Sequence, residues 1–191
     1  MAAKKSASGW AGFPQDATPY AHTGEALKKA WPKLHAGDCE PFPDAKRAAA
    51  LLKAAGKAAP KLDADALAEA LQDAWRAFHR GDFKVAFDAG ETLGPVGASV
   101  AVKAIGIHAT YLVDDDAEQL KRYEQAAKLA EAAIKALPDE ANSHYRHAFA
   151  LPRAALGRQP EPLEHAELWV VPNPSGLNAH QTIDSLAAAY R

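Results

Sequence analysis

The sequence predicts an all-α fold of stacked antiparallel helix pairs, with an irregular N-terminal arm and a strand-loop-helix C-terminal tail. About a quarter of the 191 residues are alanine, which has the highest helix propensity of all residues. Apolar residues recur at helical spacing between residues 45 and 151, and glycine and proline separate these periodic stretches. Because 48% of the residues are hydrophobic and 24% are charged, the composition is that of a globular protein and excludes a disordered one.

Residues 1–44 are expected to form an arm followed by one short helix. The arm, residues 1–22, alternates aromatic residues with glycine and proline, which favours an irregular segment that packs on its own protein over one that binds a partner. Thr23 is the expected N-cap of a helix that ends at Leu34. A proline-stiffened connector follows at 38–44. The aromatic residues of the arm are Trp10, Phe13 and Tyr20.

Residues 45–151 are expected to form the main helical domain. Asp63 or Asp65 starts a helix with one apolar face, and Gly81 marks the turn after it. Residues 98–113 are apolar nearly all round, so this helix is expected to be the most buried one. The remaining helices are expected at 45–58, 83–93, 118–137 and 140–151.

The helix over 118–137 has the most regular pattern and is expected to be the longest. Charged residues cover one of its faces, and an apolar stripe follows the other. That stripe consists of Leu120, Tyr123, Ala127, Ala130, Ile134 and Leu137. Packing of the stripe on the neighbouring helices predicts one shared core that contains Trp75, Phe78, Ile105, Tyr123 and Ile134.

Two stretches of the helical domain share an order of aromatic, small and turn residues. In the first, the turn at Gly81 precedes Phe83, and Ala86 follows three residues later. In the second, Tyr123 precedes an alanine by three residues and a closing proline, Pro138, ends the unit. This spacing resembles the tetratricopeptide repeat over roughly residues 65–151. The resemblance implies stacked helix pairs with a concave surface that binds a protein or peptide; an ordinary helical bundle is the alternative.

The tail, residues 152–191, has a different composition, rich in proline and without helical periodicity. A short apolar run suited to a strand, 168–171, leads into a Pro-Asn-Pro-Ser-Gly-Leu-Asn string and then a terminal helix at 182–191. This tail resembles the C-terminal part of the mismatch-specific uracil/thymine DNA glycosylases. The resemblance implies a loop that enters duplex DNA where a base is flipped out. The residues that would form this wedge are Asn173, Pro174, Ser175, Gly176, Leu177 and Asn178.

The catalytic half of that family's pattern is missing from the sequence. The family positions its attacking water with the asparagine of a Gly-Ile-Asn-Pro-Gly motif, whereas the only Asn-Pro pair here is Asn173-Pro174 in the tail. The parallel sheet of the family is missing as well, because residues 1–151 have helical patterns, and the run at 168–171 therefore has no partner strand. We expect no catalytic residue and no glycosylase activity, with a glycosylase or a DNA-binding remnant of one as the alternative.

The sequence gives little support for a metal site or for a nucleic-acid-binding surface. His144 and His147 share a helical face, and His35 precedes Cys39 by four residues, but neither pair has a third ligand at the right spacing, so no metal or other cofactor is expected. The net charge of −2 does not favour nucleic-acid binding by the whole chain.

The absence of a long apolar segment, of a leader sequence and of a second cysteine predicts a cytoplasmic protein that does not enter membranes. The sequence therefore predicts a non-catalytic interaction module with a protein or peptide partner, duplex DNA being the second candidate. Its expected parts are 1–44, 45–151 and 152–191.

Overall fold

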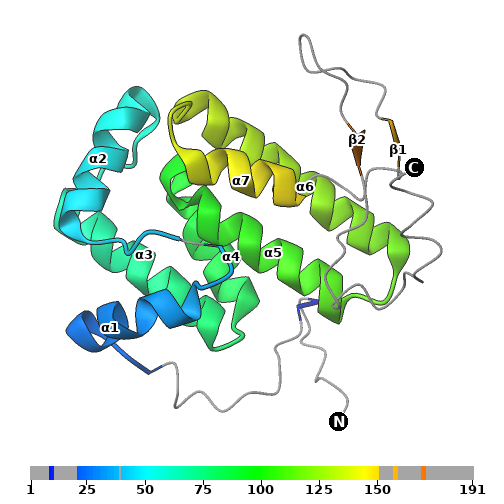
Figure 1. Ribbon diagram of the computed structural model, residues 1–191, viewed down its shortest axis with the longest axis horizontal. Coiled ribbons are helices and arrows are strands. Elements are labelled where there is room, and N and C mark those ends of the chain that lie inside the picture. The colour runs from blue at the N-terminus through cyan, green and yellow to red at the C-terminus, as the bar shows by residue number, and fades with distance from the viewer. Residues whose placement is uncertain (1–8, 11–20, 39, 151–156, 159–168, 171–191) are drawn as a thin grey trace. The chain divides into compact units, whose positions relative to one another are not determined.

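The computed structural model describes residues 9–10, 21–38, 40–150, 157–158 and 169–170. The chain divides into two compact units, residues 1–152 and 153–191. The described part of the first unit is all-α, as predicted, and contains seven α-helices (Figure 1). These are α1 (Gly24–Leu34), α2 (Ala45–Ala55), α3 (Ala64–His79), α4 (Phe83–Thr92), α5 (Ala98–Leu112), α6 (Asp116–Ala136) and α7 (Ala141–Ala150).

Aspartate side chains fix the start of three of these helices. Asp44 accepts a hydrogen bond from a backbone N–H in the first turn of α2, and Asp63 and Asp115 do the same for α3 and α6. Thr23 is the N-cap of α1, as predicted, although its side chain makes no capping hydrogen bond. Gly81 has φ +81°, a left-handed conformation that suits glycine in the turn between α3 and α4.

Each helix from α2 onward packs against the next one along the chain. In addition, α3 contacts α5, and α5 contacts α7, so α5 lies between these two helices. Nine of the residues of α5 are buried, which confirms that this helix is at the centre of the unit. Trp75 of α3 and Ile105 of α5 belong to the same buried cluster, and Phe78 packs against it, as predicted.

The buried face of α6 agrees with the predicted stripe only in part, since Ala130 and Leu137 are buried but the other members of the stripe are not. Its buried residues are Arg122, Ala126, Ala130 and Ala133, whereas Leu120 is 48% exposed. Tyr123 and Ile134 are only half-buried and lie outside both hydrophobic clusters, so their prediction as core residues was wrong. An alanine stripe lets the backbones of two helices approach more closely than a stripe of Leu, Tyr and Ile would allow, and this close contact decided the rotation of α6.

Part of the N-terminal arm packs on the helices, as predicted. The indole of Trp10 lies 5.4 Å from the ring of Phe87 and 4.6 Å from that of His108, measured between ring centroids. The guanidinium of Arg122 covers the same indole at 4.5 Å and donates a hydrogen bond to the carbonyl oxygen of Gly9. The other two aromatic residues of the arm, Phe13 and Tyr20, lie outside the described residues.

In the second unit the structure describes two short strands, β1 (Gly157–Arg158) and β2 (Trp169–Val170). They pair antiparallel, with Gly157 opposite Val170 and Arg158 opposite Trp169. The expectation that the apolar run at 168–171 has no partner strand was therefore wrong: a two-residue stretch with no strand signal of its own supplies the backbone partners. The predicted loop and terminal helix of the tail lie outside the described residues.

Candidate functional site

A network of buried charges joins the connector between α1 and α2 to helices α5 and α7. Asp38 accepts hydrogen bonds from Lys103 of α5 and from Arg146 of α7, the latter at 2.8 Å. The side chain of Arg146 is only 2% exposed and that of Asp38 only 6%. Both cations also lie over the indole of Trp75, with Nζ of Lys103 at 5.6 Å and the guanidinium carbon of Arg146 at 5.8 Å. The network therefore fixes the connector against two helices that lie far from it in sequence.

The surroundings of Asp38 favour its charged form. Burial by itself opposes ionisation, but the hydrogen bonds from His35, Lys103 and Arg146 outweigh it and hold the pKa of Asp38 well below its usual value. For Lys103 the balance is the opposite: burial lowers the pKa of its ammonium group more than the contact with Asp38 raises it. Asp38 is therefore the fixed negative charge of this network.

Two histidines extend the network into the core. His35 Nδ1 lies 3.0 Å from Asp38 Oδ1, and His35 Nε2 lies 3.1 Å from Nε2 of His79. With the Nδ1 proton of His35 donated to Asp38, the remaining lone pair of His35 accepts a hydrogen bond from His79. Burial, followed by the electrostatic effect of His35 and Lys103, lowers the pKa of His79 to about 3, so this histidine is neutral at pH 7.

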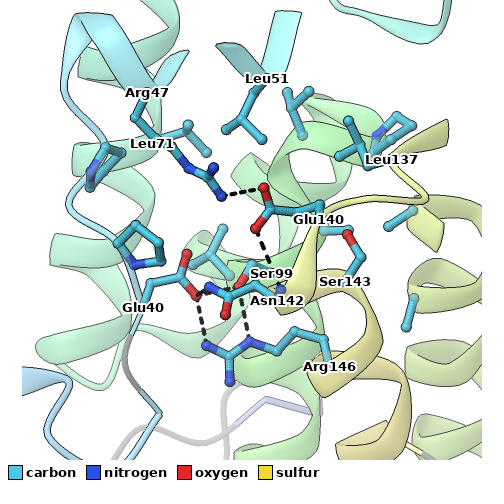
Figure 2. Close-up of a pocket in the computed structure, with 18 of the residues that line it drawn as sticks. Glu40, Arg47, Leu51, Leu71, Ser99, Leu137, Glu140, Asn142, Ser143 and Arg146 are labelled. Atoms are coloured by element: carbon cyan, nitrogen blue, oxygen red, sulfur yellow. Dashed lines mark hydrogen bonds and ion pairs between the residues drawn. The ribbon is translucent and has the colours of Figure 1, made fainter. Parts of the chain in front are cut away.

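Glu40 is the second acid of the connector and is held by one of its two oxygens. Glu40 Oε2 accepts hydrogen bonds from Ser99 Oγ at 2.5 Å, Asn142 Nδ2 at 2.9 Å and Arg146 Nη2 at 2.8 Å. The side chain is 9% exposed. Oε1 accepts no hydrogen bond from any described residue, and in Figure 2 it points away from Arg146 towards a cavity.

That cavity is lined by the connector and α2, by α3, α5, α6 and α7, and by the turn before α5. We call it the inner cavity; its volume is about 30 Å³. Apolar side chains of Leu71, Val96 and Leu137 line it together with the polar groups of Glu40 and Asn142 (Figure 2). Because this volume suits one small polar group such as a water molecule, the inner cavity is too small for a ligand by itself.

A second and larger cavity continues from the first. This outer cavity, between α2 and the turn that joins α6 to α7, has a volume of about 280 Å³, and most of its wall is apolar. The two cavities have four lining residues in common, so we treat them as one groove. The common residues are Arg47, Leu51, Leu137 and Glu140.

An ion pair crosses the groove where the two cavities meet. Arg47 Nη2 of α2 lies 2.6 Å from Glu140 Oε2, which belongs to the turn before α7 (Figure 2). The side chain of Arg47 is 27% exposed and that of Glu140 is 19% exposed. Because solvent screens a partly exposed pair, this ion pair contributes about 1 kcal/mol or less and can open at little cost.

None of the residues proposed for the DNA wedge can be placed, because residues 173–178 lie outside the described residues. Two of the histidines considered as metal ligands have other partners, and Cys39 lies outside the described residues. His144 contacts the carbonyl oxygen of Pro138, and His35 pairs with His79. In the described part of the chain no three His, Cys, Asp or Glu side chains are grouped closely enough to hold a metal ion.

The residues of the groove were not singled out by sequence reasoning. Asp38 and Glu40 looked like polar residues of a connector, and nothing in the pattern of the short helix at 140–151 singled out Arg146. The sequence did show that Asp38 and Glu40 belong to a connector stiffened by prolines. Their shared partner Arg146 lies 108 residues from Asp38 and 106 residues from Glu40, so the pairing could not be recognised.

No protein-family model matches this sequence, and no solved structure matches this chain. Among the described helices, none is both long enough and apolar enough to cross a membrane.

Proposed function

We propose that the protein is a cytoplasmic, tetratricopeptide-like interaction module that binds a peptide segment of a partner protein in the groove between α2 and the α6–α7 turn. The observation that carries this proposal is the continuity of the inner and outer cavities across the Arg47–Glu140 ion pair. A groove of this kind, with apolar walls and a few polar groups at one end, is typical of a binding site.

The order of helix contacts supports the comparison with a helical repeat. Helices α3, α5 and α7 contact one another in turn, and each also packs on the helix that follows or precedes it in the chain. In stacked helix pairs, one helix of every pair lines the same surface, and that surface binds partners. Residues of α3, α5 and α7 line the inner cavity here, and residues of the connector, α2, the turn before α5 and α6 line the rest.

The walls of the groove favour a peptide over a small polar metabolite. The outer cavity is lined by Ala50, Leu51 and Ala54 of α2 and by Leu137 and Pro138 on the opposite side. Burying apolar side chains of a partner against this wall contributes about 25 cal/mol per Å² of area removed from water. Charged groups stand at the outer edge, at the Arg47–Glu140 crossing and at the deep end, where they select which peptides bind.

A DNA-binding remnant of a mismatch glycosylase is the second candidate. It is favoured by the string at 168–178 and concerns the second unit alone. Arginines of the tail are offset by several acidic residues, which weakens the case for tight phosphate binding.

The peptide-binding proposal is tested by selection from a random peptide library displayed on phage. Ala50 is exposed and lines the outer cavity, so Ala50→Trp should fill the groove and remove binding of the selected peptides. Ala49 is exposed on the same helix and lines neither cavity, so Ala49→Trp is the matched control and should bind as the unmodified chain does. If no selected peptide distinguishes the two tryptophan variants, the groove is not a peptide site and the proposal fails.

A further inference from the structure

We propose that the deep end of this groove takes the side-chain ammonium group of a lysine in the bound peptide, an assignment that rests on the proposed function. The ammonium lies in the inner cavity beside Glu40, and the aliphatic part of the lysine lies between Leu51 and Leu137. The occupant is thus a partner peptide with a lysine as its anchoring residue.

The first observation is the unused oxygen of Glu40. Its side chain is nine-tenths buried, and three donors hold Oε2, while Oε1 faces the inner cavity without a hydrogen bond from any described residue (Figure 2). This oxygen is therefore open to a donor, and a ligand ammonium that donates to it gains the strength of a charge-assisted hydrogen bond.

Further acceptors face the same space. Glu140 lines both cavities, and its Oε1 lies 3.4 Å from the backbone nitrogen of Asn142, whose side chain donates to Glu40. Both carboxylates therefore lie next to the same residue of α7. Ser143 is 7% exposed and brings a hydroxyl group to the inner cavity that has no hydrogen-bond partner among the described residues. Together these groups offer three oxygen sites, which is the number that the three N–H donors of an ammonium require.

The charges of the groove favour a cation over an anion. The charge of Arg146 is already balanced by the buried carboxylates of Asp38 and Glu40. The other cation that lines the groove is Arg47, and its partner Glu140 is partly exposed to solvent. Carboxylates, by contrast, stand at the deep end, at the crossing and at the outer edge, where Asp139 lies. An incoming carboxylate would meet like charges in all three places, whereas an incoming ammonium releases Arg47 to solvent and takes its place beside Glu140.

The size of the inner cavity selects lysine among cationic side chains. A volume of about 30 Å³ suits a compact ammonium and not the planar fork of a guanidinium. Leu51 and Leu137 line both cavities, and such an apolar wall suits the unbranched aliphatic chain of lysine. Arginine should therefore be a poor substitute despite its equal charge.

The test uses n-butylammonium, which reproduces the lysine side chain, in NMR titrations of the full protein. We expect saturable shifts of the backbone amides of Glu40, Leu51 and Ser143, with n-butylguanidinium binding ~10-fold more weakly and n-butanol and butyrate causing no saturable shift. Glu40→Gln should weaken n-butylammonium binding by ~10-fold. Because Glu40 also bonds Arg146, a second variant, Glu140→Gln, keeps the buried network and should still weaken binding several-fold.

Equal shifts with butyrate, or binding of n-butylammonium that neither glutamine variant changes, would overturn the lysine assignment. The peptide selection separates this failure from that of the proposed function. Peptides that bind the unmodified chain and Ala49→Trp but not Ala50→Trp, and that share no lysine, would leave the peptide groove in place and overturn the lysine pocket. Enrichment of lysine, with loss of binding when that lysine is replaced by norleucine, would support both.

Discussion

Lowering the pH from 7 to 5 is expected to reduce the free energy of unfolding by about 4 kcal/mol, because two buried histidines are neutral in the folded protein. Burial, followed by the electrostatic effect of His35 and Lys103, lowers the pKa of His79 from 6.5 to about 3. Burial, followed by the charge of Arg122, lowers the pKa of His108 from 6.5 to about 4. Both side chains are buried, so the charge that a bound proton brings would lie out of contact with water, which is unfavourable.

The direction of this change in the free energy of unfolding follows from the number of protons that the folded and unfolded states bind. In the unfolded chain both histidines have a pKa near 6.5, so below that pH the unfolded state binds more protons than the folded state and unfolding becomes easier. The loss begins near pH 6.5 and ends at about pH 4 for His108 and about pH 3 for His79. Between pH 7 and pH 5 each histidine accounts for about 2 kcal/mol. Asp38 adds almost nothing in this range, because the carboxyl group stays ionised in both states until the pH falls towards its unfolded value of 3.8.

Urea denaturation at pH 7, 6 and 5, followed by circular dichroism at 222 nm, measures this dependence. His79→Gln removes one of the two titrating groups and should halve the loss between pH 7 and pH 5, whatever its effect on stability at pH 7. His22 is exposed, so His22→Asn is the control and should show the same loss as the unmodified chain. An unfolding free energy that stays constant within about 1 kcal/mol over this range would refute the reasoning that both histidines are buried and neutral.

Three further outcomes are expected. Trp75→Ala should lower the free energy of unfolding by about 3–5 kcal/mol in chemical denaturation, because its side chain is 2% exposed within the main cluster; a loss below about 0.5 kcal/mol would place this side chain outside the core. Gly97→Ala should lower the midpoint of thermal unfolding, because a Cβ at this position would lie 2.2 Å from the carbonyl oxygen of Gly90, whereas Gly37→Ala meets nothing within 4 Å and should leave the midpoint nearly unchanged; equal midpoints would contradict the close contact. The full chain should release no uracil from a labelled G·U duplex, because the sequence lacks the asparagine that positions the attacking water; multiple-turnover release that Leu177→Ala abolishes would overturn that expectation.

Local features of the sequence predicted where the helices begin and end. Asp63, one of the two residues predicted to start α3, caps that helix, and Gly81 forms the turn where the glycine was predicted to lie. The prediction of α5 as the most buried helix was also correct, since a helix that is apolar on all sides has no face to offer to water. These features depend on residues a few positions apart, and such short-range interactions can be recognised in one sequence.

The tertiary structure decided which faces meet and which charges pair. The alanine stripe of α6 is buried in place of its larger apolar residues because it fits closely against α5, and the sequence of α6 contains both stripes. Glu40 and Arg146 meet across 106 residues, and the pairing of Trp169–Val170 with Gly157–Arg158 likewise requires two segments to be brought together. Such contacts depend on the shape and charge of two distant surfaces at once, so hydrophobic periodicity within one segment cannot reveal them.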